Sequence, residues 1–351
     1  MIKSAVILVV WAIIFPMIGG VAFCQSDFYA GKNILMVVAT DPGGSGDLRT
    51  KAIVPLLRKY IPGNPPIVVQ YMPGAGGQKA ANHLFKAVRP DGLTIGAMLT
   101  GMLQGAIFTE SGVLYDIDKF IYLGSHARYA PYAFLSRKGA GLSNKEKLRT
   151  TSGVRIGAPS VGHTLYVTAR LFAYVMDMKE PRFVTGYTPR ELDLVIDRGE
   201  IDARVNIVDS TIQRNPHWFE KDLIDLHAVL DIPKGVSHAH PRFAKLPDIE
   251  TFAKSRREER LIELLRALRG TGQPFVLPPG TPADRVDILK EAMRKALRDP
   301  EYAKTYERLT TEPAMPMMPE EYDRALREIP REPELIDLVK KLAGPGALPP
   351  R

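Results

Sequence analysis

The sequence predicts an α/β protein of two lobes, and three observations lead to this fold class. A short apolar run, a glycine-rich loop and an amphipathic helix recur along the chain from Asn33. Strands that alternate with helices in this way form parallel-rich sheets flanked by helices. A polar connector over 136–153 separates two such groups, and 351 residues with 45% hydrophobic side chains suffice for two cores.

The first group contains three apolar runs that we expect to be strands, at 34–40, 67–72 and 93–99. The first run is followed by the loop DPGGSGD (41–47) and the second by PGAGG (73–77). An amphipathic helical pattern follows each of these loops. The same order of strand, loop and helix is therefore expected twice before residue 100.

The second group and the tail continue the pattern. We expect strands at the runs 154–158, 183–187, 201–207 and 226–232, with a short strand FVLPP after residue 274. A loop PSVGH leads into a helix over 164–176. Capping signals predict further helices: a capping box from Thr188 to Glu191, Ser255 opening a helix that ends near Gly270, and Thr281-Pro282 opening one that ends near Leu297.

The glycine-rich loops indicate where a ligand binds. In open sheets of this kind, loops at the carboxyl ends of strands face a crevice. Glycines let main-chain NH groups turn toward an anion, and the following helix adds its partial positive end. Three loops of this kind favour an anionic ligand, although a single one would be explained as a tight turn needed only for packing.

Composition excludes some functions. The chain has 47 Lys and Arg against 39 Asp and Glu, and the surplus of +8 is scattered along the sequence. Such a surface suits anions, but no run of basic residues interleaved with aromatic ones indicates nucleic-acid binding. His238-Ala239-His240 has no third ligand at a recognisable spacing, so we expect no metal site and no cofactor.

The N-terminal stretch predicts export. An apolar run after Lys3 ends at Pro16 and at Gly19-Gly20, as in a secretory signal peptide over 1–24. A retained membrane anchor is the alternative, because about 20 apolar residues can span a bilayer. Cys24 is the one cysteine, so cleavage after it leaves a mature chain without thiols or disulfides. A periplasmic location follows from these features.

Two enzyme classes fit the stretch RIGAPSVGHT (155–164) only in part. Its glycines match a phosphate loop, but His163 stands where the phosphate-binding lysine belongs, which argues against a nucleotide site. Ala158-x-Ser160-x-Gly162 imitates the nucleophile elbow of a serine hydrolase, with Ser160 as nucleophile. The histidines that could complete such a triad are His227, His238 and His240. Hydrolysis stays an alternative, although no glycine cluster lies where that fold needs an oxyanion loop.

Several motifs in order resemble the Bug family, the periplasmic receptors of tripartite tricarboxylate transporters. They are DPGGSGD, YMPGAGGQKAANHLFKAVRPDGLTIG, GAPSVGHT, LPDIETF and PPGTPADRVDILKEAMRKALRDPEY. The resemblance implies a two-lobed, periplasmic-binding-protein-like (Venus flytrap) receptor without enzymatic activity. It also implies a small carboxylate as ligand (a di- or tricarboxylate, an aromatic acid or an amino acid), permease subunits in the membrane as partners, and a monomer.

The resemblance also implies which residues bind the ligand. They are Gly43, Gly44, Ser45 and Asp47 in the first loop, Ala75, Gly76 and Gly77 in the second, and Ser160, Gly162, His163 and Thr164 in the second lobe. Gly76 and Gly77 permit close main-chain approach, whereas Asp47 is expected to cap its helix because it would repel an anion. His163 either senses ligand charge or only packs against the loop.

The family pattern also sets the expected lobe boundaries. The first lobe comprises 25–124 plus 231–351, and the second comprises 125–230. The second-lobe loop departs from the family's usual S-x-G-x-G, and the stretch around Asn206 and Asp209 departs as well, so the sequence leaves the ligand open. A scaffold or sensor subunit that binds another protein is a third class of function.

Overall fold

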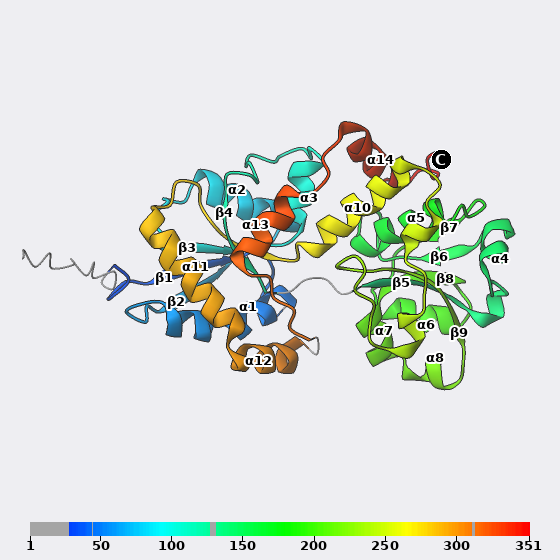
Figure 1. The fold of residues 1–351 in the computed structure, drawn as a ribbon, viewed down its shortest axis with the longest axis horizontal. Coiled ribbons are helices and arrows are strands. Elements are labelled where there is room, and N and C mark those ends of the chain that lie inside the picture. Colours follow the sequence, from blue (N-terminus) through cyan, green and yellow to red (C-terminus); the bar gives the residue numbers. More distant parts are fainter. Residues whose placement is uncertain (1–27, 44, 127–130, 311–312) are drawn as a thin grey trace, which may run out of the picture.

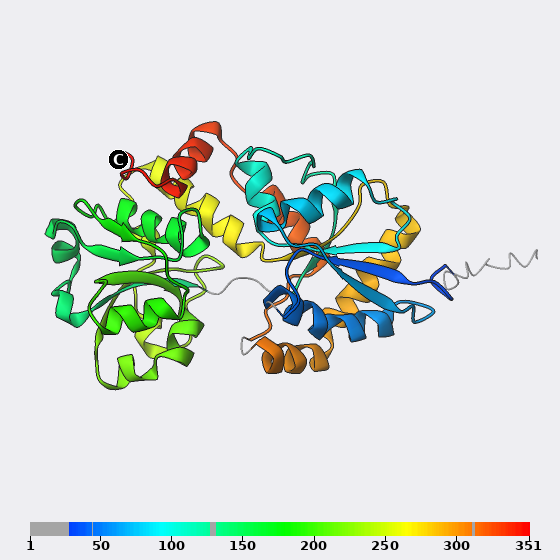
Figure 2. The same cartoon turned by 180° about the vertical axis from the view of Figure 1, so that it is seen from behind.

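The structure, a computed structural model, describes residues 28–43, 45–126, 131–310 and 313–351, and it confirms the two-lobed α/β fold (Figures 1 and 2). Each lobe contains one five-stranded sheet with helices on both faces. The predicted signal peptide and Gly44 lie outside the described residues. Among the described residues, no helix combines the length and apolar content needed to cross a bilayer.

The first sheet has the strand order β2-β1-β3-β10-β4. Its strands are β1 Ile34–Val38, β2 Ile67–Tyr71, β3 Thr94–Ala97, β4 Ile121–Ser125 and β10 Pro274–Leu277. Its helices are α1 Ser45–Tyr60, the 3-10 turn η1 Ala75–Gly77, α2 Gln78–Lys86, α3 Gly101–Ile107, α11 Ala283–Arg298, α12 Pro300–Thr310 and α13 Pro319–Arg327. One face packs on α1, α11 and α12, and the other on α2, α3 and α13.

The second sheet has the strand order β7-β6-β8-β5-β9. Its strands are β5 Tyr132–Arg137, β6 Arg155–Gly157, β7 Arg182–Val184, β8 Ala203–Ile207 and β9 Ile224–Leu230. The helices near it are η2 Lys138–Ala140, α4 Lys145–Thr150, α5 Thr164–Val175, α6 Glu191–Asp197, α7 Val208–Arg214, α8 Pro216–Glu220, α9 Pro241–Ala244, η3 Ile249–Phe252, α10 Arg256–Gly270 and α14 Pro333–Ala343. The core under α5 and the core under α6 and α8 lie on opposite faces.

The sheets are mixed, with as many antiparallel strand pairs as parallel ones. β1 pairs in parallel with β2 and β3, and β6 with β7 and β8. β10 is antiparallel to β3 and β4, and β5 is antiparallel to β8 and β9. β10 and β5 arrive directly from the other lobe, without a helical crossover on their own sheet, so they run against their neighbours.

Helix starts follow the predicted capping signals. Thr188 and Glu191 form the capping box, because the Thr188 amide donates to Glu191 Oε2 at 2.7 Å and the Glu191 amide donates to Thr188 Oγ1 at 3.2 Å. The Ser255 hydroxyl accepts from the Glu258 amide at 3.3 Å, and α10 ends at Gly270 as predicted. Local side-chain chemistry thus decides where these helices begin.

Two chain crossings between the lobes lie side by side on the first sheet. β4 leads through His126 to β5, and α10 leads through residues 271–273 to β10. The Ser125 hydroxyl donates to the Gln273 carbonyl at 3.0 Å, and the Thr100 hydroxyl donates to the Gly272 carbonyl at 2.6 Å. These hydrogen bonds join the two crossings to each other and to the first lobe.

The lobe boundaries remain a proposal, and packing refines the one at residue 231. Phe243 is buried with Ala133 and Val229 of the second sheet and with Val208 of α7. The Asp231 amide donates to the Asp248 carboxylate at 3.0 Å. We therefore propose that the segment 231–253 moves with the second lobe, in place of the first lobe that the sequence suggests.

Candidate ligand-binding site between the lobes

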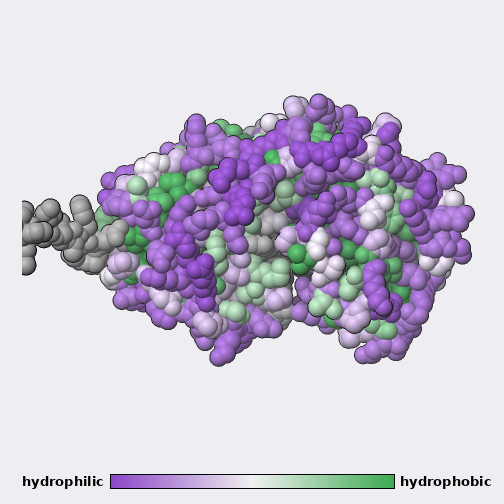
Figure 3. All heavy atoms as spheres, in the orientation of Figure 1, coloured by the Kyte–Doolittle hydropathy of each residue, from purple (hydrophilic) through white to green (hydrophobic). Residues whose placement is uncertain are grey.

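Strand direction places three loops on the gap between the lobes. β4 ends at Ser125, just before the chain crosses, and β10 is antiparallel to both β4 and β3, so β1, β2 and β3 end toward the second lobe. β5 begins after the crossing and β8 is antiparallel to it, so β8 and its parallel neighbour β6 end toward the first lobe. The loops 39–43, 72–77 and 158–163 therefore border this gap (Figure 2), which Figure 3 shows as a hollow along the lower edge.

The first loop is fixed by the carboxylate of Asp47. Its Oδ2 accepts from the Gly43 amide and from Lys51 Nζ, both at 2.7 Å, and its Oδ1 accepts from the Tyr71 hydroxyl at 2.8 Å. Burial by itself would raise the pKa of Asp47, but these hydrogen bonds outweigh it and lower the pKa. Both carboxylate oxygens are thus engaged within the protein, and Asp47 joins the first loop to the end of β2.

The second loop has a backbone that only glycine-rich sequences adopt. Gly74, Ala75, Gly76 and Gly77 all have positive φ, at 136°, 45°, 60° and 98°. Gly77 is the N-cap of α2 and provides no side chain to bond the first amides of that helix. These amides are therefore not covered by a capping side chain, which is the arrangement by which helix N-termini hold anions.

Neighbouring strand ends confine the second loop closely. A Cβ on Gly77 would lie 3.3 Å from Leu99 Cβ and 3.6 Å from Ala39 Cβ. A Cβ on Gly101, the first residue of α3, would lie 2.2 Å from the carbonyl oxygen of Gly76. The loops after β1, β2 and β3 thus pack against one another. This contact requires glycine at 101, whereas glycine at 76 is favoured by its φ of 60°.

The third loop begins α5 in the second lobe. Ser160 and Gly162 are exposed, and the His163 amide donates to the Ser160 carbonyl at 3.1 Å. His163 Nδ1 accepts from the Leu165 amide at 3.1 Å, which makes His163 the N-cap of the helix. The structure gives His163 a capping role, and whether its ring also senses the charge of a ligand stays a prediction.

The surroundings of this histidine favour its neutral form. Desolvation of its ring, and then the charge of Arg269, lower the pKa of His163 below the usual 6.5. Because the folded protein favours the neutral ring, the resulting stability is full above pH 6.5 and is lost as the pH falls through the lowered value. A neutral ring can accept the Leu165 amide, whereas a protonated ring cannot.

Replacement of His163 tests the capping role. We expect His163→Ala to lower the free energy of unfolding by about 1 kcal/mol, because the Leu165 amide loses its acceptor. His163→Asn keeps a capping oxygen and should retain most of that stability. Urea unfolding at pH 7.5 measures both variants. Equal losses in the two would show that the ring packs rather than caps.

Three residues near the site carry no local sequence signal. Tyr71 reads as an ordinary strand residue, yet its hydroxyl bonds Asp47. Gly101 opens a short helix, and its role appears only when the Gly76 carbonyl lies beside it. Arg269, which is 3% exposed in α10, lies close enough to affect His163. Each depends on contacts between segments far apart in sequence.

Some predicted site residues can be placed only in part. Gly44 lies outside the described residues, and only the backbone of Ser45 is described, as the first residue of α1. Thr164 begins α5, where its carbonyl accepts from Thr168 Oγ1 at 2.8 Å. The three loops border one gap, but whether each named residue touches a ligand remains a prediction.

The triad that a hydrolase needs is not assembled among the described residues. The Nε2 atom of His227 lies 2.8 Å from Ser136 Oγ, and that of His238 lies 2.9 Å from Asp209 Oδ1. His240 accepts from the Arg242 amide at 3.3 Å. In the described parts of the chain, none of these histidines hydrogen-bonds Ser160, and no group of three or more His, Cys, Asp or Glu residues could hold a metal ion.

Solved structures of two-lobed periplasmic binding proteins share the fold of this chain. No family model matches the sequence, and no curated protein matches it. A TctC solute binding protein from Polaromonas is similar in structure, with a TM-score of 0.66, 17% identity, and 90% of this chain and 98% of that chain covered. The periplasmic binding protein BugD is similar with a TM-score of 0.54 and 16% identity, and the match covers 90% of this chain and 98% of that chain. MatC from Rhodopseudomonas palustris, with bound malate, is similar with a TM-score of 0.54 and 17% identity, and the match covers 89% of this chain and 99% of that chain.

These likenesses confirm the predicted fold. The matched regions cover nearly the whole chain, so they include both lobes. The low sequence identity limits the conclusion to architecture, and the ligand must be argued from the residues of this chain.

Proposed function

We propose that this protein is an extracytoplasmic receptor that binds a small carboxylate between its lobes. It delivers the ligand to permease subunits of a tripartite tricarboxylate-type transporter and has no chemistry of its own. The observation that carries the proposal is the convergence of three glycine-rich loops on one gap. Supporting it, the MatC structure of similar fold holds malate, a dicarboxylate.

The chemistry of the loops suits a carboxylate better than a phosphate or a neutral solute. Main-chain amides and the N-terminus of α2 attract negative charge, but the third loop lacks the lysine of a phosphate loop. The carboxylate of Asp47 accepts hydrogen bonds from Gly43, Lys51 and Tyr71. These donors offset its negative charge, so it repels an anionic ligand less. Hydroxyl groups of the second lobe, on Ser160 and Thr164, complete the proposed binding set.

Thermal-shift and calorimetric titration test the proposal with protein shown to be free of ligand. The panel comprises dicarboxylates, tricarboxylates, aromatic acids and amino acids. A true ligand at a hundredfold excess over Kd adds about 2.7 kcal/mol of stability. At about 2–4 °C per kcal/mol, the melting temperature should rise by several degrees. If no member of the panel stabilises the protein, the receptor proposal is contradicted.

An esterase assay separates the hydrolase alternative. We expect no turnover of activated esters above background, and Ser160→Ala should leave that background unchanged. Turnover that disappears in Ser160→Ala would instead establish Ser160 as a nucleophile. A scaffold or sensor role would show as capture of a partner protein that survives bulky replacements at Gly76 and Gly77.

A further inference from the structure

A second space between the lobes lies away from the glycine-rich loops. It is a cavity of about 470 Å³, bounded by α13, by α10 and by residues 232–234, which follow β9. We call it the hinge cavity. No residue of the three glycine-rich loops belongs to its described lining. The hinge cavity is therefore distinct from the proposed ligand site.

The order of strands places the hinge cavity and the ligand site on opposite sides of the chain crossings. In the first sheet, β1, β2 and β3 lie on one side of β10 and β4, the strands that join the crossings. Met317, which lines the cavity, pairs with Ser125 along the outer edge of β4. In the second sheet, β6, β7 and β8 lie on one side of β5, and β9 lies on the other. The crossings thus run between the two spaces.

The first lobe supplies one wall of the hinge cavity through α13 and the residues before it. The amides of Ser125 and Met317 each donate to the carbonyl of the other residue, both at 3.0 Å. The Tyr322 ring stacks on Tyr122 of β4 at a centroid distance of 4.9 Å. Ala325, which lies about one turn further along α13, lines the cavity. This wall is therefore fixed to the first sheet.

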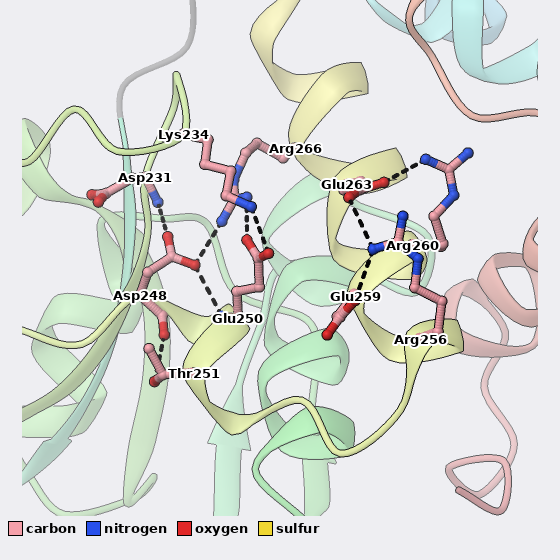
Figure 4. Close-up of polar contacts among 10 residues, drawn as sticks. All are labelled: Asp231, Lys234, Asp248, Glu250, Thr251, Arg256, Glu259, Arg260, Glu263 and Arg266. Atoms are coloured by element: carbon pink, nitrogen blue, oxygen red, sulfur yellow. Dashed lines mark hydrogen bonds and ion pairs between the residues drawn. The ribbon is translucent and has the colours of Figure 1, made fainter.

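The second lobe supplies the facing wall, which an ionic network holds together (Figure 4). Arg266 of α10 donates to Asp248 Oδ1 at 2.6 Å and to Glu250 Oε2 at 2.9 Å. Lys234 also pairs with Glu250, at 2.5 Å. Since Arg266 is only 6% exposed, this network holds α10 and residues 232–234 firmly together. The hinge cavity is therefore bounded by both lobes.

Part of the lining is apolar, and both lobes contribute to it. Ile232 and Met317 are 2% and 5% exposed and line the cavity from the second and the first lobe. Ala267 of α10 and Ala325 of α13 are small and only partly buried, so they leave space between the two helices. An apolar side chain can enter such a space without leaving a buried polar group unpaired.

From this arrangement we propose that the hinge cavity controls carboxylate affinity, because a side chain that fills it favours the closed arrangement of the lobes. The proposal rests on the receptor function proposed above. A rotation about the crossings that brings the glycine-rich loops together moves α13 away from residues 232–234, since these walls lie on the other side of the crossings. Opening narrows the cavity. A filled cavity therefore resists opening and raises the fraction of protein that is ready to bind.

Substitutions at the two alanines test the effect on affinity by calorimetric titration with the carboxylate found in the panel. Ala325→Trp should lower Kd about fivefold, which is at the low end of typical couplings between sites. Ala267→Leu adds a smaller group from the α10 wall and should act in the same direction. Arg327→Trp places the same ring at an exposed position of α13 outside the cavity, and it should leave Kd unchanged.

Distances between the lobes in the absence of ligand test the effect on closure. Spin labels are placed at Gln70→Cys in β2 and Arg182→Cys in β7, which are exposed positions on the outermost strands of the ligand side. Since Cys24 of the predicted signal peptide is the one native cysteine, the labels are specific in the mature chain. Ala325→Trp should shift the distance distribution to shorter values, and Arg327→Trp should leave it unchanged.

The two measurements separate this proposal from the receptor proposal. Unchanged or longer distances in folded Ala325→Trp would overturn the role of the hinge cavity, whether or not the unmodified protein binds a carboxylate. If Ala325→Trp does not fold, the distances in Ala267→Leu decide in the same way. Failure of the unmodified protein to bind any member of the panel would instead contradict the receptor proposal.

Discussion

Replacing Gly101 by alanine is expected to weaken carboxylate binding at least about tenfold, equivalent to roughly 1.4 kcal/mol. The new methyl group would lie 2.2 Å from the Gly76 carbonyl oxygen and 3.0 Å from the Gly76 carbonyl carbon. Both are backbone atoms, so the second loop must move to accommodate the methyl group. Overpacking of this kind costs about 1–3 kcal/mol, and here the loop that moves is the proposed carboxylate loop.

Calorimetric titration of Gly101→Ala with the ligand found in the panel measures this effect. Gly270→Ala is the matched control, because its methyl group would meet Ile232 at an ordinary 3.6 Å at the end of a helix. We expect the control to bind as the unmodified protein does. Full affinity in a folded Gly101→Ala variant would show that the second loop does not hold the ligand.

Replacing Asp47 by alanine is expected to lower the free energy of unfolding by about 3 kcal/mol and to weaken ligand binding. The side chain of Asp47 is buried, and it accepts from the Gly43 amide, Lys51 and Tyr71. Without it, the Gly43 amide and the Tyr71 hydroxyl lose their acceptor, and the first loop is no longer joined to β2. Asp41→Asn replaces an exposed residue of the same loop and serves as the control. We expect it to change the free energy of unfolding only slightly.

The pH dependence of stability distinguishes Asp47→Asn from the unmodified protein. The pKa of Asp47 is lowered in the folded state, so its stabilisation is present above pH 3.8 and is lost as the pH falls through the lowered value. The asparagine variant cannot titrate there, and its unfolding free energy should fall less steeply on acidification. Urea unfolding at a series of pH values from 5 downward measures how steeply the free energy of unfolding falls with pH in each of the two proteins. Identical slopes would contradict the role given to the ionised carboxylate.

The sequence predicted most elements that belong to a strand, loop and helix unit. β1, β2, β3, β6, β8 and β9 all overlap the apolar runs assigned to them. β1 and β3 are largely buried and read as continuous apolar stretches, whereas β2 alternates between half-buried and exposed residues. β4 and β5 were missed because they join directly across the lobes, without the loop and helix that marked the other units. The antiparallel directions of β5 and β10 have the same origin.

The candidate site was predictable as a set of loops but not as a set of contacts. The glycines of the second loop predicted an unusual backbone, and four successive residues of that loop have positive φ angles. Asp47 was expected to cap its helix, but its printed hydrogen bonds go to the Gly43 amide before the helix, to Lys51 and to Tyr71. Its partner Tyr71, 24 residues away, and the contact of Gly101 with Gly76 required the folded chain.

The sequence by itself determined the alternation of strands and helices, the capped helix starts and the glycine loops, because these depend on residues near one another along the chain. Tertiary structure alone decided that the loops border one gap, that His163 caps α5 under the influence of Arg269, and that GPGALPPR lies along that helix. Such features arise from contacts between distant segments. Local periodicity and capping chemistry carry no information about which segments will meet.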